Sequence, residues 1–153
     1  MKYYQGNQNE TFDREFAQGY LCCPEGNWGG WPLMRELRRG DVVFHYNSSS
    51  GAVLGISRIV GIGHHKGAAT LSSSVIEGSQ CIRYLGQHLS EADFDDRRRQ
   101  HMRQKYPTYN EVHTAPILRK NLGKLLERTP QVYLLSIDER VAERFLSDHG
   151  VRL

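Results

Sequence analysis

The sequence lacks the features that mark a disulfide scaffold, a zinc protein or a membrane protein. Its three cysteines are an adjacent pair, Cys22 and Cys23, and the distant Cys81, which matches neither a disulfide framework nor zinc-ligand spacing. No stretch approaches the ~20 apolar residues that span a bilayer, and the first residues contain no signal-peptide core. We therefore predict a cytoplasmic protein without a membrane partner, whose cysteines are small buried hydrophobes.

Recognisable catalytic motifs are also lacking. The sequence contains no glycine-rich phosphate loop, nucleophile elbow or zinc-protease helix. The histidine pair His64 and His65 does not have the spacing of a metal site. The carboxylates of Asp93, Asp95 and Asp96 precede arginines on one expected helix, and carboxylates from a single helix seldom enclose magnesium. We predict no catalytic residue, no metal and no cofactor.

Length and composition are those of an ordinary globular domain. The 153 residues predict a single domain over 1–153, and the 39% apolar and 24% charged content argue against disorder. The formal net charge of +3 is mild. It permits a polyanionic partner without requiring one, so the distribution of the charges matters more than their total.

Local patterns in the first half of the chain predict strands over 2–5, 41–46 and 52–62, with a turn over 47–51 between the last two. Thr11 can cap a helix that Gly19 ends, and Pro32 can open a second short helix that ends at Gly40. Residues 22–30 and 64–74 are expected to be loops. In the strand over 41–46, alternation predicts Val42, Phe44 and Tyr46 on one face and Val43 and His45 on the other.

The second half predicts strands over 79–85 and 131–137 and helices over 90–106, 116–127 and 138–148. On the last helix, Val141, Ala142, Phe145 and Leu146 are expected to face inward. Strands are too many in the middle of the chain for a strict strand–helix alternation. The predicted fold class is α/β in the α+β sense: a small curved mixed sheet or partly closed β-barrel with flanking helices.

An aromatic, glycine-rich loop contains both tryptophans of the chain, Trp28 and Trp31, separated by glycines. Glycines let a backbone approach a ligand closely, and indole faces stack on bases or cations. The alternative is that the two rings plug one end of the barrel as a small core. This segment alone favours neither interpretation.

A run of cations follows the acidic start of the helix expected over 90–106. On a solvated surface helix this is an ordinary arrangement, because the helix dipole favours acidic residues in the first turns. The functional alternative is phosphate contact, with Tyr106 and Tyr109 near enough to stack on bases. The phosphate-binding candidates are Arg97, Arg98, Arg99, Arg103 and Lys105.

Two nearby segments resemble EVE domains. The first is Trp31-Pro32-Leu33-Met34-Arg35-Glu36-Leu37-Arg38-Arg39-Gly40-Asp41-Val42-Val43-Phe44-His45-Tyr46, and the second is the stretch over 51–61. In that family a short helix leads through Gly-Asp into an aromatic-rich strand, and small residues then carry the chain past a ligand pocket. The opening, with Lys2-Tyr3-Tyr4, Asn7 and Gly19-Tyr20-Leu21-Cys22, is similar to YTH domains. Both families have the PUA-like fold, so the resemblance implies that fold and an aromatic cage for a modified nucleobase.

The resemblance also implies site residues. Asn7 falls where YTH domains place a polar contact to the base, and Leu21 and Cys22 fall where a cage tryptophan and its polar neighbour sit. Leucine cannot stack as tryptophan does, so this is a departure from the family pattern. We expect Trp28 or Trp31 to replace the missing ring.

Two further base-binding candidates follow from the same resemblance. Tyr46, at the end of the Gly-Asp strand, is the next candidate wall of the cage, and Ser57 lies in the stretch that passes the pocket. Aromatic walls replace the stacking that a flipped base loses, and polar groups read its edge. A methyl group on the base adds apolar area that favours such a pocket.

The expected function is therefore non-catalytic binding of nucleic acid with a modified, methylated base, in DNA rather than RNA. Families of this kind serve as recognition modules of modification-dependent restriction systems, so an effector nuclease domain or chain is an expected partner. The first alternative is an RNA-binding or RNA-processing protein with nuclease activity from His45, His64 or His65. The second is a small-ligand or protein-interaction module that keeps the fold.

Overall fold

The computed structural model describes residues 1–9, 12–24, 29–66 and 108–153. Within these ranges six strands form one mixed sheet in the order β2-β5-β4-β3-β1-β6. The elements are β1 (Tyr3–Gln8), α1 (Phe12–Gln18), β2 (Tyr20–Pro24), the 3-10 helix η1 (Trp31–Arg35), β3 (Val42–Asn47), β4 (Ala52–Lys66), β5 (Thr108–Arg119), β6 (Leu134–Ile137) and α5 (Glu139–Asp148).

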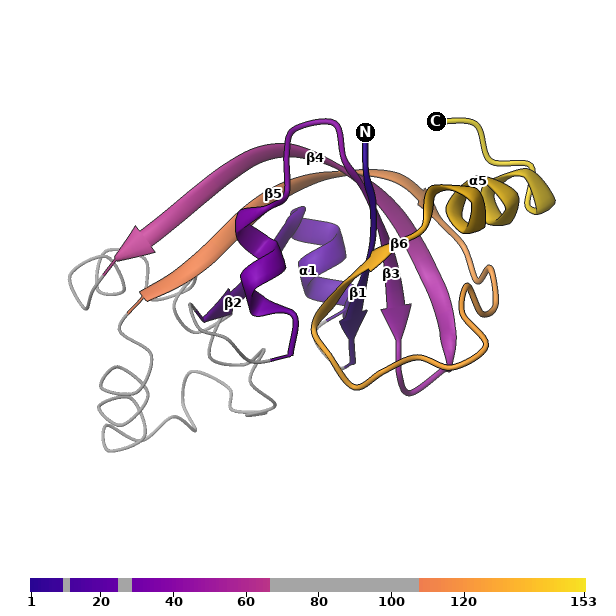
Figure 1. Cartoon of the computed structure of the whole chain (residues 1–153), viewed down its shortest axis with the longest axis horizontal. Helices are drawn as coiled ribbons and strands as arrows, with labels where there is room; N and C mark the ends of the chain where they lie inside the picture. The colour runs from indigo at the N-terminus through magenta and orange to yellow at the C-terminus, as the bar shows by residue number, and fades with distance from the viewer. Residues whose placement is uncertain (10–11, 25–28, 67–107) are drawn as a thin grey trace.

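The one parallel pair among the described strands is β1 and β3, with Asn7 opposite Tyr46. β3 and β4 form the antiparallel hairpin that the sequence predicts, and β4 pairs antiparallel with β5 from Gly55 to Lys66. Figure 1 shows these two long strands arching over the domain, so that the sheet is a half-barrel with a concave inner face. The predicted mixed, curved sheet is confirmed.

Alternation along the strands gives the sheet two buried faces, each with its own hydrophobic cluster. The outer cluster comprises Tyr3, Val42, Phe44, Val53, Ile56, Leu122, Leu125, Ile137, Ala142, Phe145 and Leu146. The inner cluster comprises Tyr4, Leu21, Cys23, Trp31, Met34, Leu37, Val43, Ile59, Val112, Tyr133 and Leu134. The predicted division of 41–46 into two faces is confirmed, and so is the prediction of a buried cysteine in the case of Cys23.

The C-terminal helix α5 covers the outer face. Its N-cap is Asp138, whose side chain accepts hydrogen bonds from the backbone N–H groups of Arg140 and Val141. Phe145 packs edge-to-face on Phe44, with ring centroids 5.7 Å apart. The inward position predicted for Val141 is wrong, because this side chain is 39% exposed. Neither α5 nor any other helix among the described residues is long and apolar enough to cross a membrane.

The helix predicted over 116–127 is wrong. β5 continues its ladder with β4 to Arg119, and beyond it the N–H of Leu122 donates to Val53 O at 2.9 Å. Leu122 and Leu125 are nevertheless buried in the outer cluster. The helical spacing of the leucines therefore reflects apolar contacts made from an irregular segment, which local pattern cannot distinguish from a buried helix.

Three other boundaries differ from the prediction. The expected loop over 22–30 begins within β2, which pairs antiparallel with β5. The expected loop at 64–74 begins within β4, which extends to Lys66. The helix opened by Pro32 is only the five-residue 3-10 helix η1, which ends at Arg35 rather than near Gly40. The strand predicted over 79–85 and the helix predicted over 90–106 lie outside the described residues.

Candidate nucleic-acid interface

A chain of hydrogen bonds between buried side chains crosses the inner face of the sheet. Ser57 Oγ lies 2.6 Å from His45 Nε2, and His45 Nδ1 lies 2.8 Å from Gln8 Oε1. Gln8 Nε2 donates to Glu15 Oε2 at 2.6 Å. All four residues are buried, with Ser57 and His45 completely so. We call these residues, from β4, β3, β1 and α1, the polar relay.

Burial keeps the histidine of the polar relay neutral. His45 is enclosed by the sheet and α1, and removal from water lowers its pKa from 6.5 to about 3. A neutral imidazole has one N–H donor and one bare acceptor nitrogen, so it can transmit a hydrogen bond from one neighbour to the next. The relay is therefore a set of oriented dipoles around an uncharged ring at neutral pH.

Two phenylalanines of α1 enclose the His45 ring. Phe16 packs edge-to-face on it with centroids 5.0 Å apart, and Phe12 does so at 6.2 Å. This close approach requires Gly55, which lies opposite His45 in the hairpin. A Cβ at position 55 would lie 2.5 Å from Phe16 Cε2, inside the contact distance of carbon atoms. α1 thus sits against the sheet where a side chain is missing, in the concavity visible in Figure 1.

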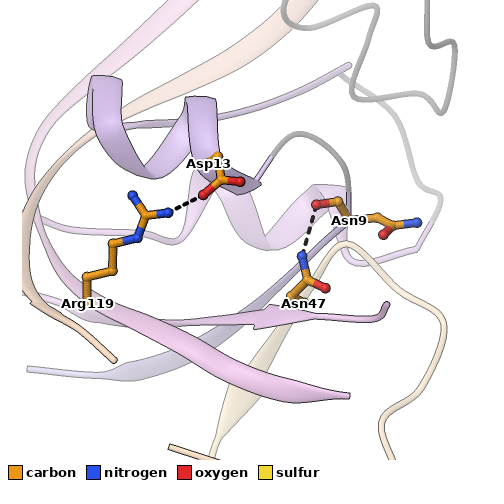
Figure 2. A network of polar contacts seen from close by, with 4 residues as sticks. All are labelled: Asn9, Asp13, Asn47 and Arg119. Carbon is orange, nitrogen blue, oxygen red and sulfur yellow. Dashed lines mark hydrogen bonds and ion pairs between the residues drawn. The ribbon is translucent and has the colours of Figure 1, made fainter. Parts of the chain in front are cut away.

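The outer side of α1 is held by exposed polar contacts, which Figure 2 shows together. The guanidinium of Arg119 on β5 pairs with Asp13, and the two side chains are 57% and 78% exposed. The same guanidinium lies 5.7 Å from the centre of the Phe12 ring. Ahead of the helix, Asn47 Nδ2 donates to Asn9 O at 3.0 Å. Exposed pairs of this kind contribute little stability, so the attachment of α1 depends mainly on its buried face.

Three of the predicted base-binding residues lie on the inner face. Ser57 ends the polar relay. Leu21 and Trp31 are both buried in the inner cluster, where Leu21 would lie 3.8 Å from a Cβ added at Gly6. Trp31 is therefore part of the core in this structure, as the alternative interpretation of the aromatic loop expects.

The other two described candidates lie on the opposite face. Tyr46 packs against the outer cluster, and Asn7 is its partner in the β1–β3 register. Asn7 Nδ2 donates to Pro130 O and Val132 O at 2.9 and 2.6 Å, and its Oδ1 accepts from Gln5 Nε2 at 2.9 Å. Its amide thus holds the segment that leads into β6. The structure does not bring Asn7 and Tyr46 together with Ser57.

The remaining candidates are not placed. Trp28 and the phosphate-binding candidates Arg97, Arg98, Arg99, Arg103 and Lys105 lie outside the described residues, and only the backbone of Cys22 is described, within β2. Within the described ranges no three His, Cys, Asp or Glu side chains come close enough together to hold a metal ion.

Sequence reasoning missed four residues that surround His45. Gln8 and Glu15 belong to the polar relay, and Phe12 and Phe16 enclose it. The one signal available was the spacing of Phe12, Glu15 and Phe16, which places a carboxylate beside an apolar stripe of a short helix. This spacing alone does not show that Glu15 is a buried hydrogen-bond acceptor. That prediction also requires knowing which polar residue of the sheet faces it.

Comparison with known proteins identifies the fold. No protein-family model matches the chain, and no curated protein matches it significantly. Several solved structures are similar. A mutant of the ASCH protein from Zymomonas mobilis has a TM-score of 0.59 at 14% identity, with 96% of this chain and 98% of that chain covered. A hypothetical protein from Leishmania major has a TM-score of 0.55 at 13% identity, covering 98% and 95%.

A third similar structure is the Pho92 YTH domain in complex with m6A, with a TM-score of 0.50 at 13% identity. It covers 99% of this chain and 87% of that chain. At these identities the likenesses show the fold alone. The fold is PUA-like, as predicted, and it is shared with ASCH and YTH domains. The more specific resemblance to EVE domains stays a prediction.

Proposed function

We propose that this chain binds nucleic acid and holds one unpaired base between α1 and the inner face of its sheet. The observation that carries the proposal is the polar relay enclosed by two phenylalanine rings. Recognition of an extruded base needs polar groups for its edge and apolar or aromatic surface for its faces. The inner face combines Ser57 and His45 with Phe12 and Phe16 in this way.

The YTH neighbour supports the same proposal, because a protein with this fold has been solved with m6A bound. A methylated base gains more than an unmodified one from an apolar enclosure, at roughly 25 cal/mol per Å² of buried area. The proposed ligand is therefore a strand that carries a methylated base. The expected preference for DNA over RNA and the effector nuclease partner stay predictions.

Access to the relay requires α1 to move away from the sheet, because Ser57 is fully buried in the closed arrangement. The short helix has seven residues and is attached on its solvent side by the exposed Arg119–Asp13 pair. Its buried side is held by the Phe16–His45 contact and by the Gln8–Glu15 hydrogen bond. A base that inserts between α1 and the sheet would meet Ser57 with its edge and the phenylalanines with its face.

The nuclease alternative meets a chemical difficulty at His45. Ser57, His45 and Gln8 follow one another as a nucleophile, a base and an orienting group would. However, a general base is most effective when its pKa is near the working pH, and burial lowers the pKa of His45 to about 3. The side chains of His64 and His65 are not described. Nuclease activity stays a prediction, and cleavage products in the binding assay would support it.

A matched pair of variants tests the proposed function. Phe16→Leu and Phe145→Leu each remove an aromatic ring that packs edge-to-face on a ring of β3, one on the inner face and one on the outer face. Binding to labelled single-stranded RNA and DNA, with and without one methylated adenine or cytosine, is measured by fluorescence anisotropy. We expect Phe16→Leu to weaken binding roughly 5- to 150-fold, the scale of one base–aromatic stack, and Phe145→Leu to leave it unchanged. Equal effects of the two variants, or no binding by the parent protein, would contradict the proposal.

A further inference from the structure

The hydrogen-bond partners in the polar relay determine which group of each pair donates and which accepts. We call this order the direction of the relay. The structure turns the amide nitrogen of Gln8 toward Glu15, where it donates to Oε2 at 2.6 Å. The amide oxygen of Gln8 then faces His45 Nδ1, at 2.8 Å. An oxygen acceptor at this distance places the imidazole proton on Nδ1. The orientation of the Gln8 amide thus determines the tautomer of the His45 ring.

The tautomer in turn determines what Ser57 can do. With the proton on Nδ1, the Nε2 atom of neutral His45 is a bare acceptor, and Ser57 Oγ lies 2.6 Å from it. The hydroxyl proton of Ser57 is therefore donated to Nε2. A serine hydroxyl has one proton and two lone pairs, so its remaining capacity is to accept.

We propose that, once α1 closes over the inserted base and the Glu15–Gln8 hydrogen bond forms again, Glu15 acts through Gln8 and His45 to make Ser57 an obligate hydrogen-bond acceptor, which selects bases that present an amino group. This inference rests on the proposed function and names the class of base. Adenine and cytosine carry an exocyclic N–H donor where hypoxanthine and uracil carry a carbonyl oxygen. An amino group with one methyl substituent keeps one N–H, so it satisfies the same requirement. A carbonyl facing Ser57 would leave two acceptors in contact.

The expected discrimination follows from the penalty for an unsatisfied buried polar group. That penalty is about 1–3 kcal/mol, which corresponds to roughly 5- to 150-fold in affinity. Glu15 is a positioning residue in this scheme, because it does not touch the base. Replacing it with glutamine keeps its size but supplies both a donor and an acceptor. The direction of the relay is then no longer imposed, and Ser57 can either donate or accept.

The binding test compares oligonucleotides that differ at one position, adenine against hypoxanthine and cytosine against uracil. The parent protein should prefer the amino member of each pair, whereas Glu15→Gln should bind both members within about twofold. Ser57→Ala should lose the preference as well, because the acceptor itself is removed. Binding by the parent without an amino preference, or an unchanged preference in either folded variant, would overturn this inference while leaving the proposed function in place. No binding to any strand would instead overturn the proposed function.

The tautomer of His45 gives a readout that is independent of the ligand. Its ring nitrogens are assigned by ¹⁵N NMR in the parent protein, in Glu15→Gln and in Ser57→Ala. We expect a proton on Nδ1 in the parent and in Ser57→Ala, and a mixed or Nε2-protonated ring in Glu15→Gln. A parent ring protonated on Nε2 would overturn the inference whatever the binding results. If Glu15→Gln fails to fold, the parent and Ser57→Ala spectra still decide the direction of the relay.

Discussion

The contact between Gly55 and α1 gives the sharpest prediction about access to the inner face. A Cβ at position 55 would lie 2.5 Å from Phe16 Cε2 and 2.9 Å from Cζ. Ordinary carbon–carbon contacts are about 3.5–4.0 Å, so Gly55→Ala must move the ring by about 1 Å. The ring is already packed against His45 and Phe12, at 5.0 and 5.4 Å between centroids. It therefore has little room to move while α1 stays in place.

Overpacking of this kind costs about 1–3 kcal/mol. In Gly55→Ala the cost falls on the closed arrangement of α1, because the clash disappears when the helix moves away. If the closed arrangement predominates in the parent protein, the open population rises roughly 5- to 150-fold. The apparent affinity for a base-bearing strand should rise by the same factor, even as the melting temperature falls by about 2–4 °C per kcal/mol.

The assay combines amide hydrogen exchange in α1 with anisotropy titrations of the same oligonucleotides. Gly61→Ala is the matched control on β4, because its Cβ would make only ordinary contacts of 3.5 Å with His113. Gly55→Ala should exchange faster in α1 and bind more tightly, and Gly61→Ala should do neither. Faster exchange in α1 without any gain in affinity would refute the idea that movement of this helix limits binding. Unchanged amide exchange in α1 of Gly55→Ala would refute the inference that the added Cβ displaces Phe16.

Two further predictions concern the attachment of α1 and the titration of His45. Arg119→Ala removes the exposed ion pair with Asp13 and the cation–π contact with Phe12. Together these contacts contribute about 0.5–1.5 kcal/mol to holding α1. The rate of amide hydrogen exchange in α1 should therefore rise a few-fold, by less than in Gly55→Ala. No change in exchange would show that the exposed contacts do not hold the helix. His45→Gln should reduce the acid sensitivity of stability. In the parent the pKa of His45 is about 3 when folded and 6.5 when unfolded, so below pH 6.5 the unfolded state binds the extra proton and stability falls progressively down to about pH 3. The free energy of unfolding, measured in urea between pH 7 and 4, should fall by about 3 kcal/mol at pH 4 in the parent and not in the variant. An equal fall with pH in the two proteins would contradict this prediction.

Most of the fold could be predicted from local pattern because strong β-branched alternation and turn residues define the central hairpin. The turn over 47–51 and the strands beside it are where the sequence places them, and the helix predicted over 138–148 is α5. The helix predicted over 116–127 failed for a physical reason. Leu122 and Leu125 reach the outer cluster from an irregular segment, which at Leu122 is bonded to β4, and helical spacing of leucines is compatible with either structure.

The candidate site was less predictable, because it depends on contacts between distant segments. Asn7 and Ser57 are both polar strand residues, but strand parity places them on opposite faces once the register is known. Gln8 meets His45 across the β1–β3 pair, and Glu15 joins the relay only because α1 folds back over the sheet beside Gln8. Gly55 gives a local signal, since a glycine inside a strand often marks close approach of another element. That signal does not say which element approaches.

The central claim is that a base binds on the inner face, against the polar relay. The most direct measurement is an NMR titration of the ¹⁵N-labelled protein with a short strand containing one methylated adenine. We predict that the signals of Ser57, His45, Gln8 and α1 shift during the titration, while those of α5 on the outer face stay in place. Shifts confined to the outer face around Tyr46 and α5, or no shifts at saturating strand concentration, would contradict the claim.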